Sequence, residues 1–356
     1  MLFSPLTLGE LELPNRLVMA PLTRVRSGKA GIPGPLVVEH YRQRASLGLI
    51  VSEGTYPSHA GRGFPGQPGL VTDEQLKGWA NVTSAVHAEG GRIFAQVMHA
   101  GRVTHADTTG GYEVVAPSAI AIDGETRTYE GKKPFPVPRA LTSEELPAIV
   151  QEFVLASRKA IDAGFDGVEL HSANGYLLHE FLTPAANQRD DVYGGSPENR
   201  ARFVIEVARA VVDAVGADRV GIRISPEHNV QGALELDVAD VRATYAHLVD
   251  ALAPLKLAYL SILHKDPAAE LVQDLRARFG GTFLLNTGFG VVTTREEAKA
   301  LVAEGHADAV VVGRPAIANP DLVRRWREGL PVNDPDPSTF YTEGAVGYTD
   351  YPAYQN

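Results

Sequence analysis

Three residues with hydrogen-bonding side chains, His171, Asn174 and Tyr176, directly follow the short apolar segment 165–170. Apolar and other residues alternate within that segment, as they do in a buried strand. Imidazole and amide groups can donate to an oxygen that is becoming negatively charged, and a tyrosine hydroxyl can deliver a proton nearby. The spacing therefore predicts a site that polarises an oxygen and protonates a neighbouring atom. The simpler alternative is a polar loop whose histidine caps a helix and whose tyrosine packs.

The composition restricts the classes of protein to which the chain can belong. Its 356 residues carry a formal net charge of −10 and include no cysteine. Nucleic-acid binding needs a basic surface, so we expect no nucleic-acid partner. Without cysteine the chain has no disulfide, no thiolate nucleophile and no cysteine-held zinc or iron–sulfur cluster. The first residues lack a signal-peptide pattern and no apolar run would span a membrane, so we expect a cytoplasmic protein.

Eight apolar segments alternate with amphipathic segments along the chain. Helix starts are predicted at Ser143, Ser196 and Thr293, and Gly305 is predicted to end the last of these helices. Eight strand–helix repeats are typical of an α/β fold of the (β/α)8 TIM-barrel type, here a single domain over residues 1–356. A doubly wound sheet is the competitor, but no dinucleotide fingerprint follows the first strand. The predicted strands are 17–20, 49–52, 92–97, 167–170, 220–224, 257–262, 282–285 and 309–312.

Three further segments are expected to add to the barrel. Residues 3–13 predict a hairpin that closes the barrel floor. The connection 99–141 is long, which is typical of a lid, and its pieces 112–115 and 126–129 are predicted to pair as a small hairpin. The tail 331–356 lacks helical periodicity, but its aromatic residues predict that it docks against the body near the active site. These aromatic residues are Phe340, Tyr341, Tyr348, Tyr351 and Tyr354.

Glycines follow the last two predicted strands. Gly288 follows the seventh strand, and Gly313 with Arg314 follows the eighth. The chemistry of a barrel of this type lies at the carboxyl ends of its strands, and backbone N–H groups there can cradle a phosphate. The sequence therefore predicts a phosphate-binding site at these turns, strengthened by the arginine.

Two polar residues, Gln96 and Arg223, interrupt apolar strand patterns and are expected to face the barrel interior. Gln96 offers a donor and an acceptor to the pyrimidine edge of a flavin, and Thr23 can donate to a flavin carbonyl. Arg223 would be a cation beside a ring that becomes anionic on reduction. The alternative for Arg223 is an interior arginine paired with a core carboxylate such as Glu169.

Long ordered segments of the chain resemble the Old Yellow Enzyme family of FMN-dependent ene-reductases. These segments are 13–24, 96–102, 169–177, 181–200 and 340–352, so the resemblance covers essentially the whole chain. It implies non-covalent FMN across the barrel mouth and hydride taken from NAD(P)H, with NADPH favoured. The implied reaction is reduction of the activated C=C bond of α,β-unsaturated carbonyl compounds, nitroalkenes or related electrophiles.

The resemblance also implies roles for individual residues. His171 and Asn174 bind the activating oxygen, the flavin gives hydride to the β-carbon, and Tyr176 protonates the α-carbon. The implied cofactor-binding residues are Pro21, Thr23, Gly54, Gln96, Arg223, Gly288, Gly313 and Arg314. The implied substrate-binding residues are His171, Asn174, Tyr176, Phe64, Met98, Gln231 and Tyr341. No metal is implied.

Two departures limit what the resemblance implies. Some branches of the family carry a cysteine near the position of Leu22–Thr23, and this chain is similar to the branch with threonine. Asn174 stands where some members have a second histidine, so substrate preference can differ. Relatives with a cysteine-held cluster are excluded by composition. The implied partners are small molecules, and the expected assembly is a monomer or homodimer.

Three other functions stay open from the residues alone. An aldolase or isomerase barrel needs a lysine or carboxylate base at a strand end, and Lys256 and Lys265 are poorly placed for this role. A metal-dependent hydrolase would use strand-end ligands such as His99, His171 and His264, but no His-x-His pattern or aspartate partner accompanies them. A non-catalytic ligand-binding barrel is the third.

Overall fold

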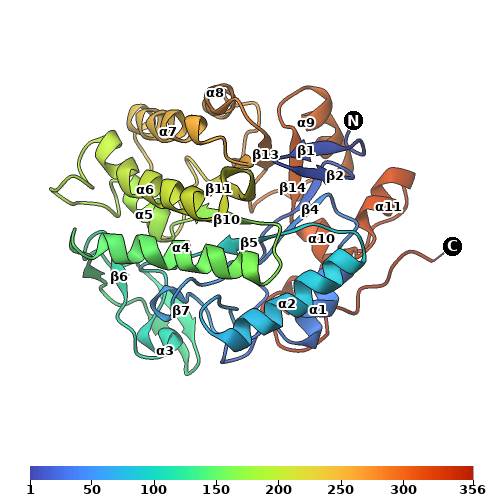
Figure 1. The fold of residues 1–356 in the computed structure, drawn as a ribbon, viewed down its shortest axis with the longest axis horizontal. Coiled ribbons are helices and arrows are strands. Elements are labelled where there is room, and N and C mark those ends of the chain that lie inside the picture. Colours follow the sequence, from blue (N-terminus) through green and yellow to red (C-terminus); the bar gives the residue numbers. More distant parts are fainter. Residues whose placement is uncertain (356) are drawn as a thin grey trace.

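The computed structural model of the chain describes residues 1–355. Eight parallel strands close into a barrel in the order β10-β11-β12-β13-β14-β3-β4-β5, surrounded by helices (Figure 1). They are β3 (Leu17–Met19), β4 (Leu49–Val51), β5 (Ile93–Val97), β10 (Gly167–Ser172), β11 (Val220–Ile224), β12 (Tyr259–Leu263), β13 (Phe283–Asn286) and β14 (Ala309–Val312). The predicted barrel is confirmed, and each strand lies within a few residues of its predicted range.

The helices cover the outer face of the barrel, and their buried faces form one large apolar cluster with the outward-facing strand residues. The long ones are α1 (Pro35–Arg42), α2 (Asp73–Ala88), α4 (Leu146–Asp162), α6 (Pro197–Val215), α7 (Val238–Leu252), α8 (Glu270–Phe279), α9 (Arg295–Ala303) and α11 (Leu322–Glu328). The short ones are α3 (Ala106–Thr109), α5 (Leu177–Leu182) and α10 (Arg314–Ala318), with 3-10 turns at His59–Gly61, Ala217–Arg219, Ala253–Leu255 and Pro337–Thr339.

The predicted helix starts are correct except at Ser143. Ser196 caps α6, and α9 is capped by Thr294, one residue after the predicted position. Helix α4 begins at Leu146, and the Ser143 hydroxyl donates instead to Asp191 at 2.6 Å. The reason is Pro147: a helix capped at Ser143 would need an N–H at position 147 to bond the Ser143 carbonyl, and proline has none, whereas in the first turn of α4 that N–H is not needed.

A hairpin closes the amino-terminal end of the barrel, as predicted. Strands β1 (Leu6–Leu8) and β2 (Leu11–Leu13) pair antiparallel. Leu8 and Leu13 are fully buried and form an apolar cluster with inward-facing residues of the barrel strands. That cluster, here called the floor, also contains Val18, Leu49, Val51, Phe94, Tyr259, Leu284, Ala309 and Val311. Gly9 turns the hairpin with φ +59°, and an added Cβ would collide with the carbonyl of Asp218.

Inward-facing side chains change character along the barrel axis. At the floor they are apolar, and glycines make room for rings: a Cβ on Gly167 or Gly221 would collide with Phe94 or Tyr259. Successive side chains of a strand point to opposite faces, so the next inward position lies two residues further on. There the residues are buried and polar, namely Gln96, Glu169, Arg223, Ser261 and Asn286.

The long connection after β5 forms two small sheets. Strand β7 (Glu125–Thr128) pairs antiparallel with β8 (Gly131–Pro134), and β6 (Val115–Ala116) pairs with β9 (Arg139–Ala140). The predicted pairing of 112–115 with 126–129 is wrong. The short turn before Gly131, which has φ +107°, lets β7 fold back on its immediate neighbour. A local hairpin costs less closure entropy than a distant pairing.

The carboxyl-terminal tail docks against the body, as predicted. Tyr348 is fully buried, and its ring stacks on His40 of α1 at 4.0 Å between centroids. The Tyr348 carbonyl accepts a hydrogen bond from the buried Arg44 at 3.4 Å and lies 3.0 Å from the Nδ1 atom of His40.

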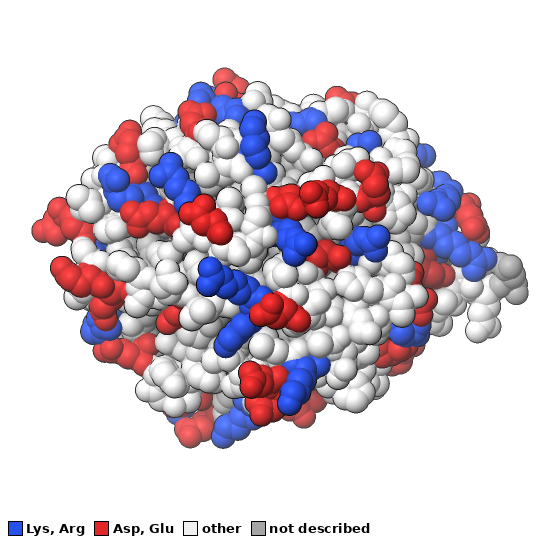
Figure 2. All heavy atoms as spheres, viewed as in Figure 1, with Lys and Arg blue, Asp and Glu red and all other residues white. Residues whose placement is uncertain are grey.

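Acidic and basic side chains are interspersed over the face drawn in Figure 2, without a large area of one sign. Within residues 1–355, no helix combines the length and apolar character that crossing a membrane requires.

Candidate active site

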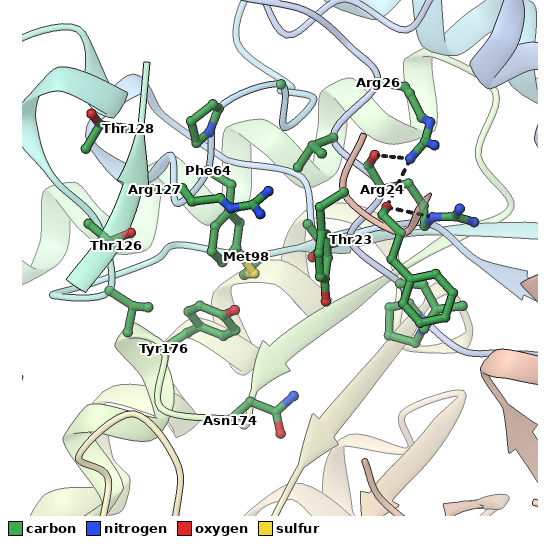
Figure 3. A pocket seen from close by; sticks show the side chains of 18 of the residues that line it. Thr23, Arg24, Arg26, Phe64, Met98, Thr126, Arg127, Thr128, Asn174 and Tyr176 are labelled. Atoms are coloured by element: carbon green, nitrogen blue, oxygen red, sulfur yellow. Dashed lines mark hydrogen bonds between the residues drawn. The ribbon is translucent and has the colours of Figure 1, made fainter. Parts of the chain in front are cut away.

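A cavity of about 1410 Å³ opens where the barrel strands end. Typical small-ligand pockets enclose roughly 300–1,000 Å³, so this cavity has room for more than one bound group. Its walls come from the strand-end loops, the β7–β8 hairpin and the tail. Figure 3 shows Phe64, Met98 and Tyr176 beside the hairpin, with Arg24 and Arg26 across the cavity from them.

Most residues predicted for the site meet in this cavity. The predicted residues that line it are Pro21, Thr23, Phe64, Gln96, Met98, His171, Asn174, Tyr176, Arg223, Gln231, Arg314 and Tyr341. Gly54, Gly288 and Gly313 were also predicted but do not contribute to its walls. Among residues 1–355, no three His, Asp or Glu side chains gather as a metal would require.

The end of β10 and the turn after it present the three residues that opened the analysis. His171 lies within the strand, which continues one residue beyond it, and is paired in register with Arg223. Asn174 adopts a left-handed conformation with φ +58°, which turns the chain sharply. Tyr176 directly precedes α5, and its ring lies 4.9 Å from the His171 ring at an interplanar angle of 74°. The three side chains therefore share one wall of the cavity.

Several buried polar atoms around this wall lack a hydrogen-bond partner. They are Nδ1 of His171, Oδ1 of Asn174, and Nε and Nη1 of Arg223. Leaving such a group unpaired typically costs about 1–3 kcal/mol, and folded proteins rarely tolerate it without a functional reason. The cluster of unpaired atoms indicates that this end of the barrel is built to receive a polar ligand.

Burial keeps both candidate oxygen-binding and proton-donating groups uncharged. It lowers the pKa of His171 well below its usual value, and the nearby positive charge of Arg223 adds to this effect. Burial also raises the pKa of Tyr176 to about 12, although the Gln231 side chain partly opposes the shift. At neutral pH the imidazole is therefore neutral and the phenol keeps its proton.

Polar residues below the cavity support Gln96 and Arg223. Gln96 donates through Nε2 to Glu169 at 2.8 Å, so part of its predicted donor capacity is already used. Among the described residues, Arg223 donates only to Asn286, at 3.3 Å. Burial lowers the pKa of Arg223, while the charge of Glu169 opposes that change without a direct ion pair. In the part of the chain that the structure describes, Arg223 and Glu169 form no ion pair, so the pairing that the alternative predicted is not observed, and Arg223 keeps unused donors.

The three glycines outside the cavity walls have specific positions. Gly54 lies behind the wall, where an added Cβ would come within 2.7 Å of Met98 Sδ and displace that side chain. Gly288 has φ +100°, and Gly313 immediately precedes α10. Arg314 donates to the Phe289 carbonyl at 2.9 Å and lines the cavity.

Two arginines that the sequence did not single out fasten the tail to the cavity. Arg24 donates to the carbonyls of Gly347 at 2.7 Å and Phe340 at 3.2 Å. Arg26 donates to the Phe340 carbonyl at 3.0 Å and to three other tail carbonyls. The buried carboxylate of Glu53 accepts from the Arg24 backbone N–H. A single sequence gives no signal for these contacts, because their acceptors are backbone carbonyls.

The β7–β8 hairpin also contributes residues that were missed. Arg127 extends from it toward the middle of the cavity (Figure 3). Tyr129 accepts a hydrogen bond from Arg62 and lies under the Lys29 ammonium at 5.6 Å. Only the length of the connection predicted that it would reach the site.

The sequence matches the NADH:flavin oxidoreductase / NADH oxidase family over residues 1–333. The chain belongs to this family. A probable flavin mononucleotide-dependent alkene reductase of Leishmania infantum is 42% identical over 99% of this chain and 97% of its own. The 12-oxophytodienoate reductase 1 of Oryza sativa subsp. japonica is 40% identical over 99% of this chain and 92% of its own.

Two solved structures share the fold of the whole chain. The Old Yellow Enzyme homologue from Zymomonas mobilis has a TM-score of 0.93 and 40% identity, covering 99% of each chain. Morphinone reductase in complex with tetrahydroNAD has a TM-score of 0.94 and 44% identity, covering 100% of this chain and 98% of its own. The Old Yellow Enzyme resemblance is confirmed, and the chain is an NAD(P)H-dependent flavin oxidoreductase.

Proposed function

We propose that the protein is an FMN-dependent ene-reductase that takes hydride from NADPH and reduces alkenes activated by a carbonyl or nitro group. The observation that carries this proposal is the cavity wall formed by His171, Asn174 and Tyr176, where neutral hydrogen-bonding groups stand beside unpaired buried atoms. The name of the similar alkene reductase supports the same reaction class. The substrates expected from this wall are cyclic enones, maleimides and nitroalkenes.

The residues around the cavity fit FMN. The unpaired Nε and Nη1 of Arg223 suit a ring carbonyl or an anionic ring, and Gln96 and Thr23 add donor and acceptor groups. When bound, FMN would supply the hydride. The proposed ring contacts are Pro21, Thr23, Gly54, Gln96 and Arg223, and the proposed phosphate contacts are Gly288, Gly313 and Arg314.

His171 and Asn174 bind the activating oxygen of the substrate. The neutral imidazole and the amide each donate a hydrogen bond, so charge that develops on this oxygen is stabilised by two buried donors. Donors arranged in this way typically lower a barrier by several kcal/mol. Withdrawal of electron density toward the oxygen prepares the β-carbon to accept hydride.

Tyr176 donates the proton that completes the reduction, at the α-carbon. Its pKa of about 12 keeps the phenol protonated over the whole physiological range. A hydroxyl can pass its proton only to an atom within hydrogen-bond reach, so the wall that seats the substrate also selects the carbon that is protonated.

Phe64, Met98, Gln231 and Tyr341 complete the proposed substrate wall, and the same space would admit the reductant and the alkene in turn. NADPH preference, the threonine-branch assignment, a single domain over residues 1–356, a monomeric or homodimeric state and a cytoplasmic location stay predictions.

The decisive experiment follows the bound cofactor by absorbance. The purified protein should show a flavin spectrum, lose it when NADPH is added without oxygen, and recover it when 2-cyclohexenone follows. A protein without flavin would contradict the cofactor assignment. A reduced protein that cyclic enones and nitroalkenes fail to reoxidise would contradict the proposed reaction.

A further inference from the structure

A buried histidine outside the predicted site contacts the turn that carries Asn174. His179 lies on α5 and has no exposed surface. Its Nδ1 atom accepts a hydrogen bond from the backbone N–H of Gly175 at 2.8 Å. Its Nε2 atom lies 3.0 Å from Oε1 of Glu235, which is also buried. The imidazole therefore joins two segments that are far apart in the sequence.

The two contacts fix the protonation of the ring. Because Nδ1 of His179 accepts from an N–H group, it carries no proton, so the ring proton is on Nε2. Nε2 then donates to the carboxylate of Glu235. The Gly175 N–H requires an acceptor at one edge of the ring, and the Glu235 carboxylate requires a donor at the other. A neutral histidine supplies both in one rigid plane.

The turn held by His179 is one that the chain does not adopt readily. Asn174 has φ +58° and Gly175 has φ +84°, and left-handed backbone is unfavourable for a residue with a Cβ atom. Other groups also hold Asn174: its N–H donates to Ser225 at 2.9 Å, and its carbonyl accepts from Gln231 at 2.6 Å. The orientation of the Asn174 side chain thus depends on contacts made by its neighbours.

Glu235 fastens the second segment, the loop 226–236. Its Oε1 accepts from the Tyr245 hydroxyl at 2.7 Å, and its Oε2 accepts from the Glu227 backbone N–H at 2.7 Å. This loop carries Gln231, which lines the cavity and holds the Asn174 carbonyl. The imidazole is therefore the direct connection between the turn and the carboxylate that anchors the loop.

We propose that His179 is a positioning residue that holds the Asn174–Gly175 turn against the loop 226–236 and so keeps the Asn174 amide where the activating oxygen binds. The inference rests on the proposed function. Without the imidazole, the Gly175 N–H would be left unpaired in a buried place, and the Glu235 carboxylate would lose one of its three hydrogen-bond partners. The turn would relax, and a displacement of about 1 Å in a catalytic group can cost roughly a hundredfold in rate.

Binding of a nitrophenol to the flavin-loaded protein tests the proposal, because its phenolate oxygen imitates the activated oxygen of a substrate. His179→Leu should weaken this binding at least about tenfold, while the rate of flavin reduction by NADPH stays within about threefold of wild type. His179→Asn, whose amide oxygen takes the place of Nδ1, should recover most of the affinity. His179→Gln, whose amide reaches only toward Glu235, should recover less.

Thr183→Val is the matched control. The Thr183 hydroxyl, next to α5, donates to the Leu234 carbonyl at 2.8 Å, so this change removes another contact to the same loop without touching Gly175 or Glu235. It should lower thermal stability but leave nitrophenol affinity at the wild-type value. Wild-type affinity in His179→Leu, or equal losses in His179→Leu and Thr183→Val, would overturn the positioning role.

If His179→Leu does not fold, the nitrophenol affinities of His179→Asn and His179→Gln test the positioning role instead. Equal affinity in these two, or tighter binding by the Gln variant, would overturn the proposal. A wild-type protein that binds flavin but no nitrophenol would instead contradict the proposed function itself.

Discussion

The two ends of the barrel are made from the same strands, yet their interiors differ. At the floor, the rings of Phe94 and Tyr259 make an apolar contact, with their centroids 5.7 Å apart, and both residues are completely buried. One inward position further along, Gln96 and Ser261 are polar. Near that upper level Arg223 keeps unpaired donors, whereas the floor residues leave nothing unsatisfied.

The difference indicates how stability and chemistry are divided within one fold. Closely packed apolar residues at the floor stabilise the barrel by excluding water. Unpaired polar groups at the mouth cost stability and are retained where a ligand pairs with them. Substitutions at the two ends should therefore have separable effects on unfolding and on turnover.

Phe94→Ala should give the largest effect, and only on stability. Removing a fully buried phenylalanine leaves a cavity and typically costs about 3–5 kcal/mol in the free energy of unfolding. Denaturant unfolding would measure this loss, and turnover per folded molecule should stay within about twofold of wild type. A comparable loss of turnover with little loss of stability would mean that the two ends are not separable in this way.

The double variant His171→Ala with Asn174→Ala should weaken ligand binding at the mouth and leave stability nearly unchanged. Each lost hydrogen bond to a charged oxygen is worth roughly 1.5–3 kcal/mol, so phenolate binding should weaken by about 3 kcal/mol or more. Titrating the flavin-loaded protein with a phenol, and following the long-wavelength charge-transfer band, would measure this loss of affinity. The FMN content should be nearly unchanged. Loss of FMN would make these residues scaffold, and unchanged affinity would place the oxygen-binding site elsewhere.

Tyr176→Phe should separate the two half-reactions. Loss of a positioned general acid typically costs roughly a hundredfold or more, so enone reduction should fall by that factor. Flavin reduction by NADPH needs no proton from this residue and should stay within a few-fold of wild type. Stopped-flow absorbance measures both rates, and equal losses would indicate a structural tyrosine.

Arg26→Ala should have a smaller effect, at the wall formed by the tail. The guanidinium donates to the carbonyls of Phe340 and Thr339, and net hydrogen bonds of this kind contribute roughly 1–2 kcal/mol together. The tail should become more sensitive to protease, and KM for a cyclic enone should rise up to about tenfold. An unchanged protease pattern would show that the Arg24 contacts are sufficient.

The smallest expected effect is that of pH on enone reduction. Burial raises the pKa of Tyr176 to about 12, so the phenol stays almost fully protonated up to about pH 10, and burial lowers the pKa of His171, so its ring stays neutral. The rate of flavin reoxidation by an enone should therefore be nearly constant from about pH 6 to about pH 10. A transition near pH 7 would show that one of these groups titrates in the working range.

The sequence predicted the parts of the site that depend on strand order. An apolar run in the sequence marks each barrel strand. Because side chains at the ends of neighbouring strands meet, the sequence could place Gln96, His171 and Arg223 in one site. It did not predict how the loops fold. The pairing of 112–115 was wrong because loop pairing depends on turn geometry rather than on apolar periodicity.

Contacts to backbone groups were also invisible from the sequence. Arg24 and His179 use the carbonyls and N–H groups of distant segments as partners, and every residue offers such groups alike. Residue types and spacing therefore indicated which side chains could do chemistry, but not which ones hold them in place.

The part of the tail that Arg24 and Arg26 hold against the cavity follows the last barrel strand in the sequence, and its contacts go to backbone carbonyls of Phe340 and Gly347. One wall of the site is therefore encoded apart from the barrel that carries the reacting groups. Mutations in this final stretch can change which alkenes fit while the eight strands stay as they are. A library of variants that changes only the exposed, cavity-lining residues of the tail, such as Tyr341, would therefore vary the substrate range without touching the strands.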